Sequence, residues 1–249
     1  MSIIIELLKN IAFYGGASAL VAILVNPLQF LKIIRQETGE KYGEIAKRNY
    51  EKGGIRIFYR GLRAYVEIQF LVNVAFAFSE FFSIKWLSVY QYELTAVGII
   101  VRAFSASILE TLMTIKSEVS QIAKNKGELM KKDGEVSSII TSIFVRNTIN
   151  WFGSLWSIYF IHKLSLGDFG GFVFSFVVGI IFAILTLPFD IVATHNCGSL
   201  EKLSILQRLK KIAFESGGYS AMYRGSIMRI IMMTCYSVSI VLVSVYLMK

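Results

Sequence analysis

The sequence predicts an all-α membrane protein: six transmembrane helices in three pseudo-repeats, with short amphipathic helices in the loops. Three observations predict this fold, namely long apolar runs, alternating long basic and short loops, and motifs that recur at matched spacing. Hydrophobic residues make up 55% of the 249 residues and charged residues only 17%, whereas soluble domains carry about 25% charged residues. The composition therefore favours a chain that is embedded in lipid.

Six apolar runs are each long enough for the roughly 20 residues that cross a bilayer. They cover residues 11–34, 64–84, 94–115, 139–162, 169–193 and 226–248. The first run lacks the basic start and the small-residue cleavage site of a signal peptide, so we expect it to be a span.

The loops after the first, third and fifth runs are long and basic. Lys and Arg number six in 37–60, five in 116–135 and four in 197–215. Because positive loops stay on one side of a membrane, these three loops should share a side and both termini the other. The net charge of +9 is then a property of solvated loops, and we expect no nucleic-acid partner.

The two prolines of the chain open related motifs, each at the end of an apolar run. The first motif is Pro27–Gln36 and the second is Pro188–Ala193. Proline kinks a helix, and polar residues that follow it inside a membrane are usually functional.

A second pair of motifs follows at nearly the same distance. Tyr59-Arg60-Gly61 has its arginine 33 residues after Pro27, and Tyr223-Arg224-Gly225 has its arginine 36 residues after Pro188. Matched spacing of matched motifs indicates an internal repeat.

The middle third then carries a degraded copy. Thr111 takes the proline position, Met113 the acidic position and Lys116 the basic position, while Asn147 takes the glycine position after Arg146. We predict one transmembrane domain over 1–249 with repeats at about 1–89, 90–166 and 167–249. Loop helices that lie at the headgroup boundary are expected at Gly43–Lys52, roughly 122–131, and Glu201–Phe214.

These motifs resemble those of the mitochondrial carrier family over essentially the whole chain. That family ends each odd span with Pro-x-acid-x-x-base-x-base-x-Gln and enters each even span with aromatic-base-Gly. Pro27, Lys32 and Gln36 match in the first repeat, and Pro188 and Asp190 in the third. The resemblance implies a six-helix barrel around a central cavity, open alternately to the intermembrane space and the matrix.

The resemblance also implies a matrix gate of three pairs between odd helices. Asp190 would face Lys32 as an intact ion pair, and Gln29 would face Lys116 through a hydrogen bond. Met113 would face Ala193, which offers nothing polar. A gate with one ion pair of three should be weakly latched. The alternative is that Asp190 and Lys32 merely satisfy each other.

Substrate contact points in the family lie seven residues past each glycine position. Here they are Ile68, Ser154 with Leu155, and Met232. The small-then-aliphatic pair is similar to the nucleotide-transporting branch and weakly favours a nucleotide-type substrate. The sequence after Pro188 lacks the arginine-rich stretch of ADP/ATP exchangers. Intramembrane charges favour a cavity or a pair, so Glu67 and Arg102 are added as cavity candidates.

The aromatic-base-Gly motifs are cardiolipin sites in the family, because the free N–H groups at a helix start attract phosphate. Carried over, the site residues are Tyr59, Arg60, Gly61, Tyr223, Arg224 and Gly225, partnered by Tyr42 and Gly43. The alternative is ordinary interfacial anchoring by Tyr and Arg.

The sequence contains no catalytic triad, phosphate-binding glycine loop or metal cluster, and its two cysteines lack metal-ligand spacing. We therefore expect no enzyme activity, no metal and no cofactor.

The expected function is exchange of a small metabolite across the inner membrane of a mitochondrion or a mitochondrion-derived organelle, by a monomer. One alternative is a non-transporting membrane adaptor on the same fold. Another is an unrelated six-span channel or membrane enzyme, which would lack three-fold symmetry.

Overall fold

The computed structural model describes residues 5, 8, 9, 11–89, 95–127, 136–199, 201, 203–215 and 217–246, and over these residues the chain is helical with no strand. Its six long helices are α2 (Gly16–Thr38), α4 (Leu62–Val89), α5 (Ala96–Lys126), α6 (Val136–Lys163), α7 (Asp168–Asn196) and α9 (Ser226–Tyr246). Its shorter helices are η1 (Ile11–Gly15), α3 (Tyr42–Gly53), η2 (Gly54–Tyr59), α8 (Ile205–Glu215) and η4 (Tyr219–Tyr223).

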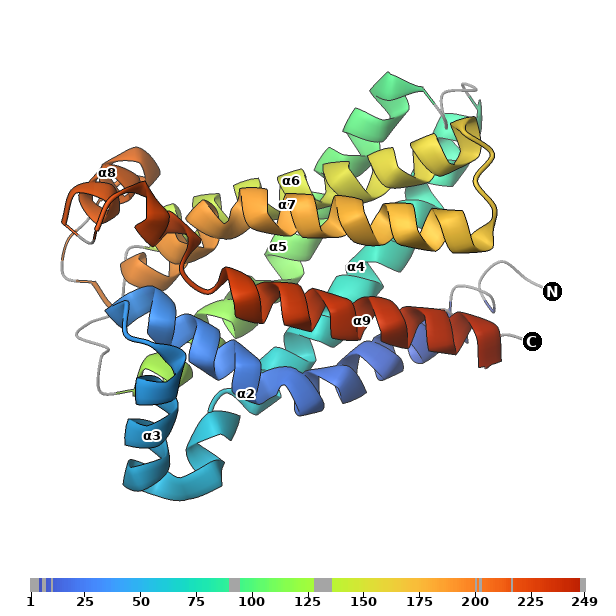
Figure 1. Ribbon diagram of the computed structural model, residues 1–249. Helices are drawn as coiled ribbons and strands as arrows, with labels where there is room; N and C mark the ends of the chain where they lie inside the picture. The colour runs from blue at the N-terminus through green and yellow to red at the C-terminus, as the bar shows by residue number, and fades with distance from the viewer. Residues whose placement is uncertain are drawn as a thin grey trace.

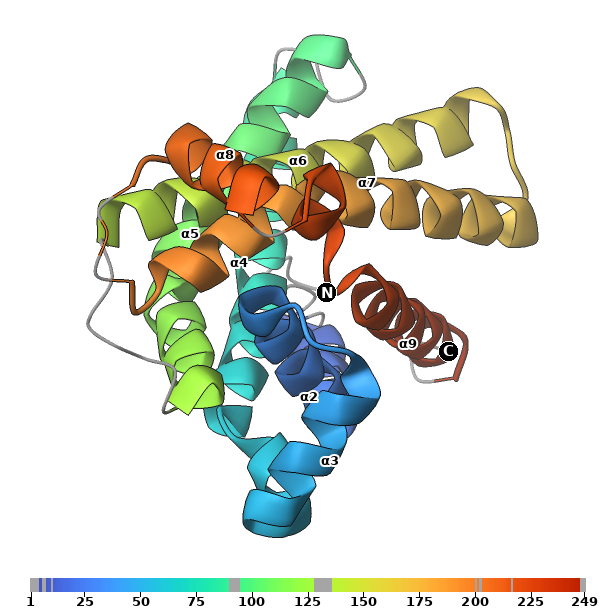
Figure 2. The same ribbon diagram turned by 60° about the vertical axis from the view of Figure 1, so that its left-hand side comes forward.

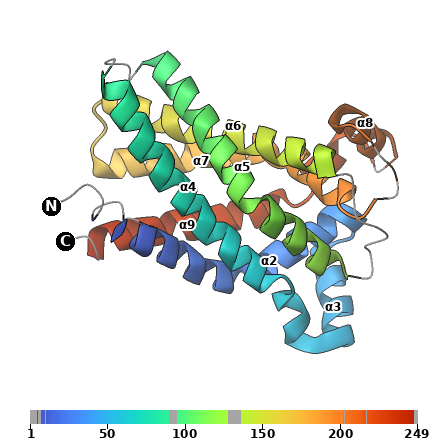
Figure 3. The same ribbon diagram turned by 180° about the vertical axis from the view of Figure 1, so that it is seen from behind.

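The six long helices form a closed ring. Each contacts the next in the order α2, α4, α5, α6, α7, α9, and α9 contacts α2. Figures 1 and 3 show opposite sides of this ring, with α4 and α5 nearest the viewer in Figure 3. The loop helices α3 and α8 lie at one end, away from the start of α2 and the end of α9 (Figure 1). The ring encloses charged side chains such as Lys32, Arg146 and Asp190.

The outer faces of the helices are apolar and exposed. On α5 they present Val97, Val101, Phe104, Ile108 and Leu112, and on α7 Val173, Val177, Ile181 and Leu185. Residues three or four apart share one helix face, so each set is a continuous apolar stripe. Apolar stripes outside and polar groups inside are typical of a helix bundle in lipid.

Three segments are long and apolar enough to cross a membrane: Ile11–Thr38, Tyr42–Ser79, which includes most of α4, and Ala96–Lys126. The bent pair Phe169–Leu185 and Leu187–Asn196 makes a fourth. The runs expected at 139–162 and 226–248 form α6 and α9, but neither meets the same criterion within the described residues. The described residues thus contain three helices, or four with the bent pair, that are long and apolar enough to cross a membrane, which indicates a helical membrane protein.

A proline kink is present in α7. Its two halves meet at 42°, two residues before Pro188. Proline lacks an N–H and its ring clashes with the carbonyl one turn back. The Thr186 hydroxyl bonds the carbonyl oxygens of Phe182 and Ala183, at 2.9 and 3.0 Å, beside the bend. The kink brings the following turn, with Asp190, toward α2 and α5. These two helices and α7 are the first, third and fifth long helices of the chain, and we call them the odd helices; α4, α6 and α9 are the even helices.

Two of the expected loop helices are confirmed, with small shifts of their ends. Gly43–Lys52 is α3, and Glu201–Phe214 is α8, which begins four residues later. The helix expected at roughly 122–131 is wrong in its first half, because residues 122–126 are the last turn of α5. Residues 128–131 lie outside the described part of the chain.

Close packing of two helix-start glycines sets the register of the repeats. A Cβ on Gly225 would lie 2.8 Å from Lys32 Cγ and 3.4 Å from Gln36 Cγ. A Cβ on Gly61 would lie 3.1 Å from Asn125 Oδ1 and 3.2 Å from the carbonyl oxygen of Gln121. We infer that Gln121 and Asn125 occupy the positions of Lys32 and Gln36, 89 residues earlier.

The alignment of the middle repeat on Thr111 is therefore wrong by five residues. In the corrected register Lys116 takes the proline position and Glu118 the acidic one. Arg146, which lines the cavity with Asn150 one turn on, then matches Arg229, and Ser142 takes the glycine position. The separation from Lys116 to Ser142 is 26 residues, against 34 from Pro27 to Gly61. The alignment on Thr111 assumed the same separation between the two motifs in every repeat. The separation is smaller in the middle repeat, so the alignment was wrong there.

Candidate functional site

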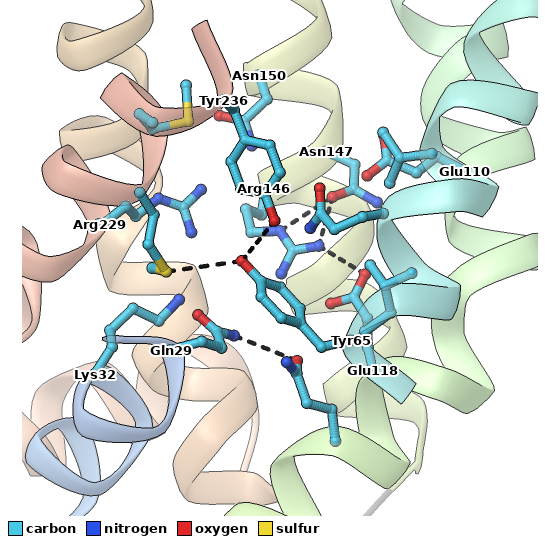
Figure 4. A pocket seen from close by; sticks show the side chains of 16 residues that line it. Gln29, Lys32, Tyr65, Glu110, Glu118, Arg146, Asn147, Asn150, Arg229 and Tyr236 are labelled. Carbon is cyan, nitrogen blue, oxygen red and sulfur yellow. Dashed lines mark hydrogen bonds and ion pairs between the residues drawn. The ribbon is translucent and has the colours of Figure 1, made fainter. Parts of the chain in front are cut away.

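A cavity of about 240 Å³ lies inside the ring (Figure 4). Side chains of α2, α4, α5, α6 and α9 line it: Gln29, Lys32, Tyr65, Ile68, Gln69, Val72, Glu110, Glu118, Gln121, Arg146, Asn147, Asn150, Arg229, Met232, Met233 and Tyr236. Three cations, two carboxylates and several amides thus face a space that is embedded in an apolar bundle.

Asp190 is the centre of the charges at the loop-helix end of the cavity. Its side chain is 4% exposed, and Lys32 Nζ lies 3.2 Å from Oδ2. Arg146 Nη1 lies 3.1 Å from Oδ1, and Arg229 Nη1 also binds Oδ2. One buried carboxylate therefore holds α2, α6 and α9 to α7. The expected pair of Asp190 with Lys32 is confirmed, and the two arginines extend it.

Glu118 is the second acid of this cluster. Its Oε1 accepts a hydrogen bond from Arg146 Nη2 at 2.8 Å and from the Thr114 hydroxyl at 3.0 Å. Arg146 also donates to Asn147 Oδ1 at 2.7 Å. Buried charges are tolerated when they are paired and hydrogen-bonded, and Arg146 is paired twice.

The expected bond between Gln29 and Lys116 is wrong. Lys116 is exposed, and Gln29 Nε2 instead donates to Gln121 Oε1 at 3.3 Å. The reason is the five-residue shift in register, which turns Lys116 outward and Gln121 toward α2. Ala193, which was expected to face Met113, packs in an apolar cluster with Ile33 and Ile143.

A second layer of polar contacts lies beyond Asp190. Lys126 Nζ lies 2.9 Å from Glu37 Oε1 and donates to the carbonyl oxygens of Thr194 and Cys197, at 3.0 and 2.6 Å. The Thr194 hydroxyl lies 3.1 Å from Gln36 Oε1. Lys126 thus joins the ends of α2, α5 and α7. Side-chain contacts therefore join each pair among α2, α5 and α7: Gln29 with Gln121, Lys32 with Asp190, and Lys126 with the end of α7.

The contact points expected from sequence are only partly at the cavity. Ile68 and Met232 line it. Ser154 is exposed and bonds the carbonyl oxygen of Asn150, while Leu155 is 3% exposed and packs in the core. The register shift explains both misses, and the pair that favoured a nucleotide lies away from the cavity.

The two charged cavity candidates were also misplaced. Glu67 is exposed on α4, and Arg102 does not line the cavity. Glu110 does line it, and its Oε2 accepts a hydrogen bond from Trp151 Nε1 at 2.5 Å. Arg146, Arg229 and Glu118 were missed. Arg229 could have been found because it lies one turn past Gly225, as Tyr65 lies one turn past Gly61.

The aromatic-base-Gly motifs have the same geometry in both repeats. Each aromatic ends a 3-10 helix, at η2 or η4, and each glycine has a positive φ, 74° at Gly61 and 93° at Gly225. Tyr59 and Tyr223 are 37% and 43% exposed. The motifs therefore present an aromatic ring and a new helix start at the loop-helix end.

Basic side chains gather beside both motifs. Arg60 lines a cavity of about 520 Å³ with Arg48, Lys52 and Lys126. Arg224 lies over Gly39 at the end of α2. At the start of α3, the Arg35 guanidinium stacks 4.6 Å from the ring centroid of Tyr42, next to Gly43. Such clusters suit phosphate, since they add charge to the free N–H groups of a helix start.

The fold and the cavity define a helical membrane protein with a charged internal site. No family model and no curated protein matches this chain. Among the described residues, no group of three or more His, Cys, Asp or Glu side chains could hold a metal ion.

Gly225→Ala is expected to lower thermal stability. The substitution places a methyl group against Lys32 and keeps a left-handed backbone (φ 93°), which costs about 1–3 kcal/mol for a non-glycine residue. Gly218→Ala is the control, because its φ is 83° and nothing lies within 4 Å of its Cβ. Unfolding of both variants in detergent should show the larger loss at Gly225. Equal losses would mean that contact with Lys32 adds nothing to the backbone strain.

Proposed function

We propose that this chain is a solute transporter of the mitochondrial carrier type. It would move a small metabolite across the inner membrane of a mitochondrion or a mitochondrion-derived organelle by alternating access. The observation that carries the proposal is a ring of six helices whose odd members are tied together at one end, beneath a charged cavity.

The closed end gives the proposed mechanism its gate. To open toward α3 and α8, the ring must separate Asp190 from cations on three other helices. The cluster gains little over solvated charges when it forms, but leaving its members buried and apart is costly. Opening therefore requires that water or a bound solute take over their contacts. A solute that binds the open state better shifts the population toward it.

The test is solute exchange by the purified protein in liposomes that contain cardiolipin. Vesicles are loaded with unlabelled nucleotides, amino acids, carboxylates or phosphate, and uptake of the labelled compound is followed. Countertransport of at least one class above protein-free vesicles is expected. A folded protein that moves none of them would overturn the proposal and favour a non-transporting membrane adaptor.

We further propose that the aromatic-base-Gly motifs bind an anionic phospholipid such as cardiolipin, with the protein a monomer. The basic residues beside Gly61 and Gly225 support this. Cardiolipin should raise the melting temperature in detergent more than phosphatidylcholine does, and Arg224→Gln should reduce that difference. An equal rise with both lipids would leave only interfacial anchoring.

A further inference from the structure

The side chains that line the central cavity include more cations than carboxylates. Lys32, Arg146 and Arg229 face it as cations, against the carboxylates of Glu110 and Glu118. Those two acids already accept from Trp151 and from Arg146. Asp190 has two oxygens for three cationic side chains.

Two side chains that line the cavity each carry a buried N–H group that lacks an acceptor within the described part of the chain. Arg229 Nε and Gln121 Nε2 are buried atoms with no hydrogen-bond partner there. Gln121 as a whole is only 3% exposed. A buried donor without an acceptor is costly. An oxygen-rich ligand would relieve that cost at both groups once the two side chains turn toward it.

Helices α4 and α9 contribute four apolar side chains to the cavity. Ile68 and Val72 on α4 face it, as do Met232 and Met233 on α9, and Met side chains adapt to irregular apolar shapes. Tyr65 and Tyr236 line the cavity from the same two helices, and their hydroxyl groups are 3.1 Å apart. The cavity therefore combines these apolar side chains with a cluster of donors, of which Lys32, Arg146 and Arg229 are labelled in Figure 4.

A cationic ligand would fit this arrangement poorly. Each carboxylate that a cation could bind already holds an arginine, a lysine or an indole N–H. A cation would also be repelled by Lys32, Arg146 and Arg229, which already outnumber the two carboxylates that line the cavity. An anion instead supplies acceptors and leaves every existing pair of Glu110 and Glu118 in place.

We propose that the substrate is a small oxyanion with an apolar body, a carboxylate or a phosphate monoester. Its oxygens bind Arg229 and Gln121, and its body lies against Ile68 and Met232. Because Arg229 also holds Asp190, the bound anion competes with Asp190 for that guanidinium and so loosens the closed end of the ring. This inference rests on the proposed transport function and names its substrate class.

Thermal unfolding of the purified full-length chain in detergent tests the substrate class without transport. The probes share one carbon skeleton: 4-methylpentanoate, 3-methylbutyl phosphate and 3-methylbutylamine. At 100-fold above its Kd, a binding anion should raise the melting temperature by about 5 °C or more. A rise with one anion identifies carboxylate or phosphate as the head group. A rise with the amine overturns the proposal. The proposal is also overturned if none of the three probes raises the melting temperature.

Variants locate the binding to the proposed residues. Arg229→Gln should abolish the anion-induced rise, while Arg102→Gln, a partly buried arginine outside the cavity, should retain it. Gln121→Glu keeps the shape and the acceptor for Gln29 but places a carboxylate beside the anion, and it should also abolish the rise. A rise retained in Gln121→Glu, or in a folded Arg229→Gln, would contradict the assignment.

The outcomes separate this inference from the proposed function. Stabilisation by an anion that is never taken up by liposomes would keep the site and overturn transport. Uptake of amines or neutral solutes without anions would keep transport and overturn the substrate class.

Discussion

Asp190→Asn is expected to lower the melting temperature of the purified protein more than any other single change considered. The substitution leaves Lys32, Arg146 and Arg229 buried around a neutral amide. Removing one partner of a buried charge pair costs about 3–5 kcal/mol, because the remaining charge is left uncompensated. Thermal unfolding in detergent measures the loss. The same variant should exchange solute faster or leak, because the closed end is no longer held.

Glu201→Gln is the control for that experiment. Glu201 also pairs with two cations, Arg208 and Lys211, but its side chain is 48% exposed beside α8. Exposed pairs contribute little to stability. If Asp190→Asn unfolds at the same temperature as Glu201→Gln and the wild type, the buried cluster does not hold the ring together.

Lys126→Met is expected to have the second largest effect. The Lys126 side chain is 1% exposed, and its ammonium group pairs with Glu37 and donates to two carbonyl oxygens at the end of α7. A cation is also favourable at a helix C-terminus. Its loss leaves a carboxylate and two carbonyls without a donor, and we expect a loss of about 3 kcal/mol in the free energy of unfolding.

Lys124→Met supplies the matched comparison. Lys124 is exposed on the same last turn of α5, so the same chemical change should alter stability within about 0.5 kcal/mol. Chemical or thermal unfolding of the Lys126→Met and Lys124→Met variants measures the difference in their stability. Equal stability of the two would show that the contacts of Lys126 with α2 and α7 contribute nothing.

Much of the first and third repeats could be predicted from sequence. Pro27 and Pro188 mark helices that reach the closed end, and the expected contact between Lys32 and Asp190 is confirmed. Both aromatic-base-Gly motifs begin helices as expected. Proline, glycine and paired charges act through local backbone rules, which a sequence displays directly.

The middle repeat could not be predicted in the same way. Residues 116–126 read as a polar loop because they include Glu118, Gln121, Asn125 and Lys126. In the structure they continue α5, and these four side chains are buried against other helices. Their partners, such as Glu37 and Thr194, are distant in sequence. Polarity that is satisfied by a distant helix has no signature in the local pattern.

The side chains of α6 that face the cavity were also predicted wrongly. Ser154 and Leu155 were placed by counting from Asn147, but Arg146, Asn147 and Asn150 are the residues of α6 that line the cavity. A shift of five residues turns a helix face by about 140°, since each residue turns it by 100°. Contacts of Gly61 and Gly225 with the odd helices were needed to set the register.

In the proposed alternating access, the cavity opens in turn at the two ends of the ring, and the Asp190 cluster closes one of them. The most direct measurement is the labelling rate of a single cysteine in the cavity, Gln69→Cys, in a Cys197→Ala, Cys235→Ser background. A membrane-impermeant maleimide is added to either face of oriented proteoliposomes. We predict labelling from the face away from α3 and α8 in the resting protein. Labelling from the opposite face should appear when a transported anion is present or when Asp190 is replaced by Asn. Labelling from one face alone under every condition would contradict alternating access.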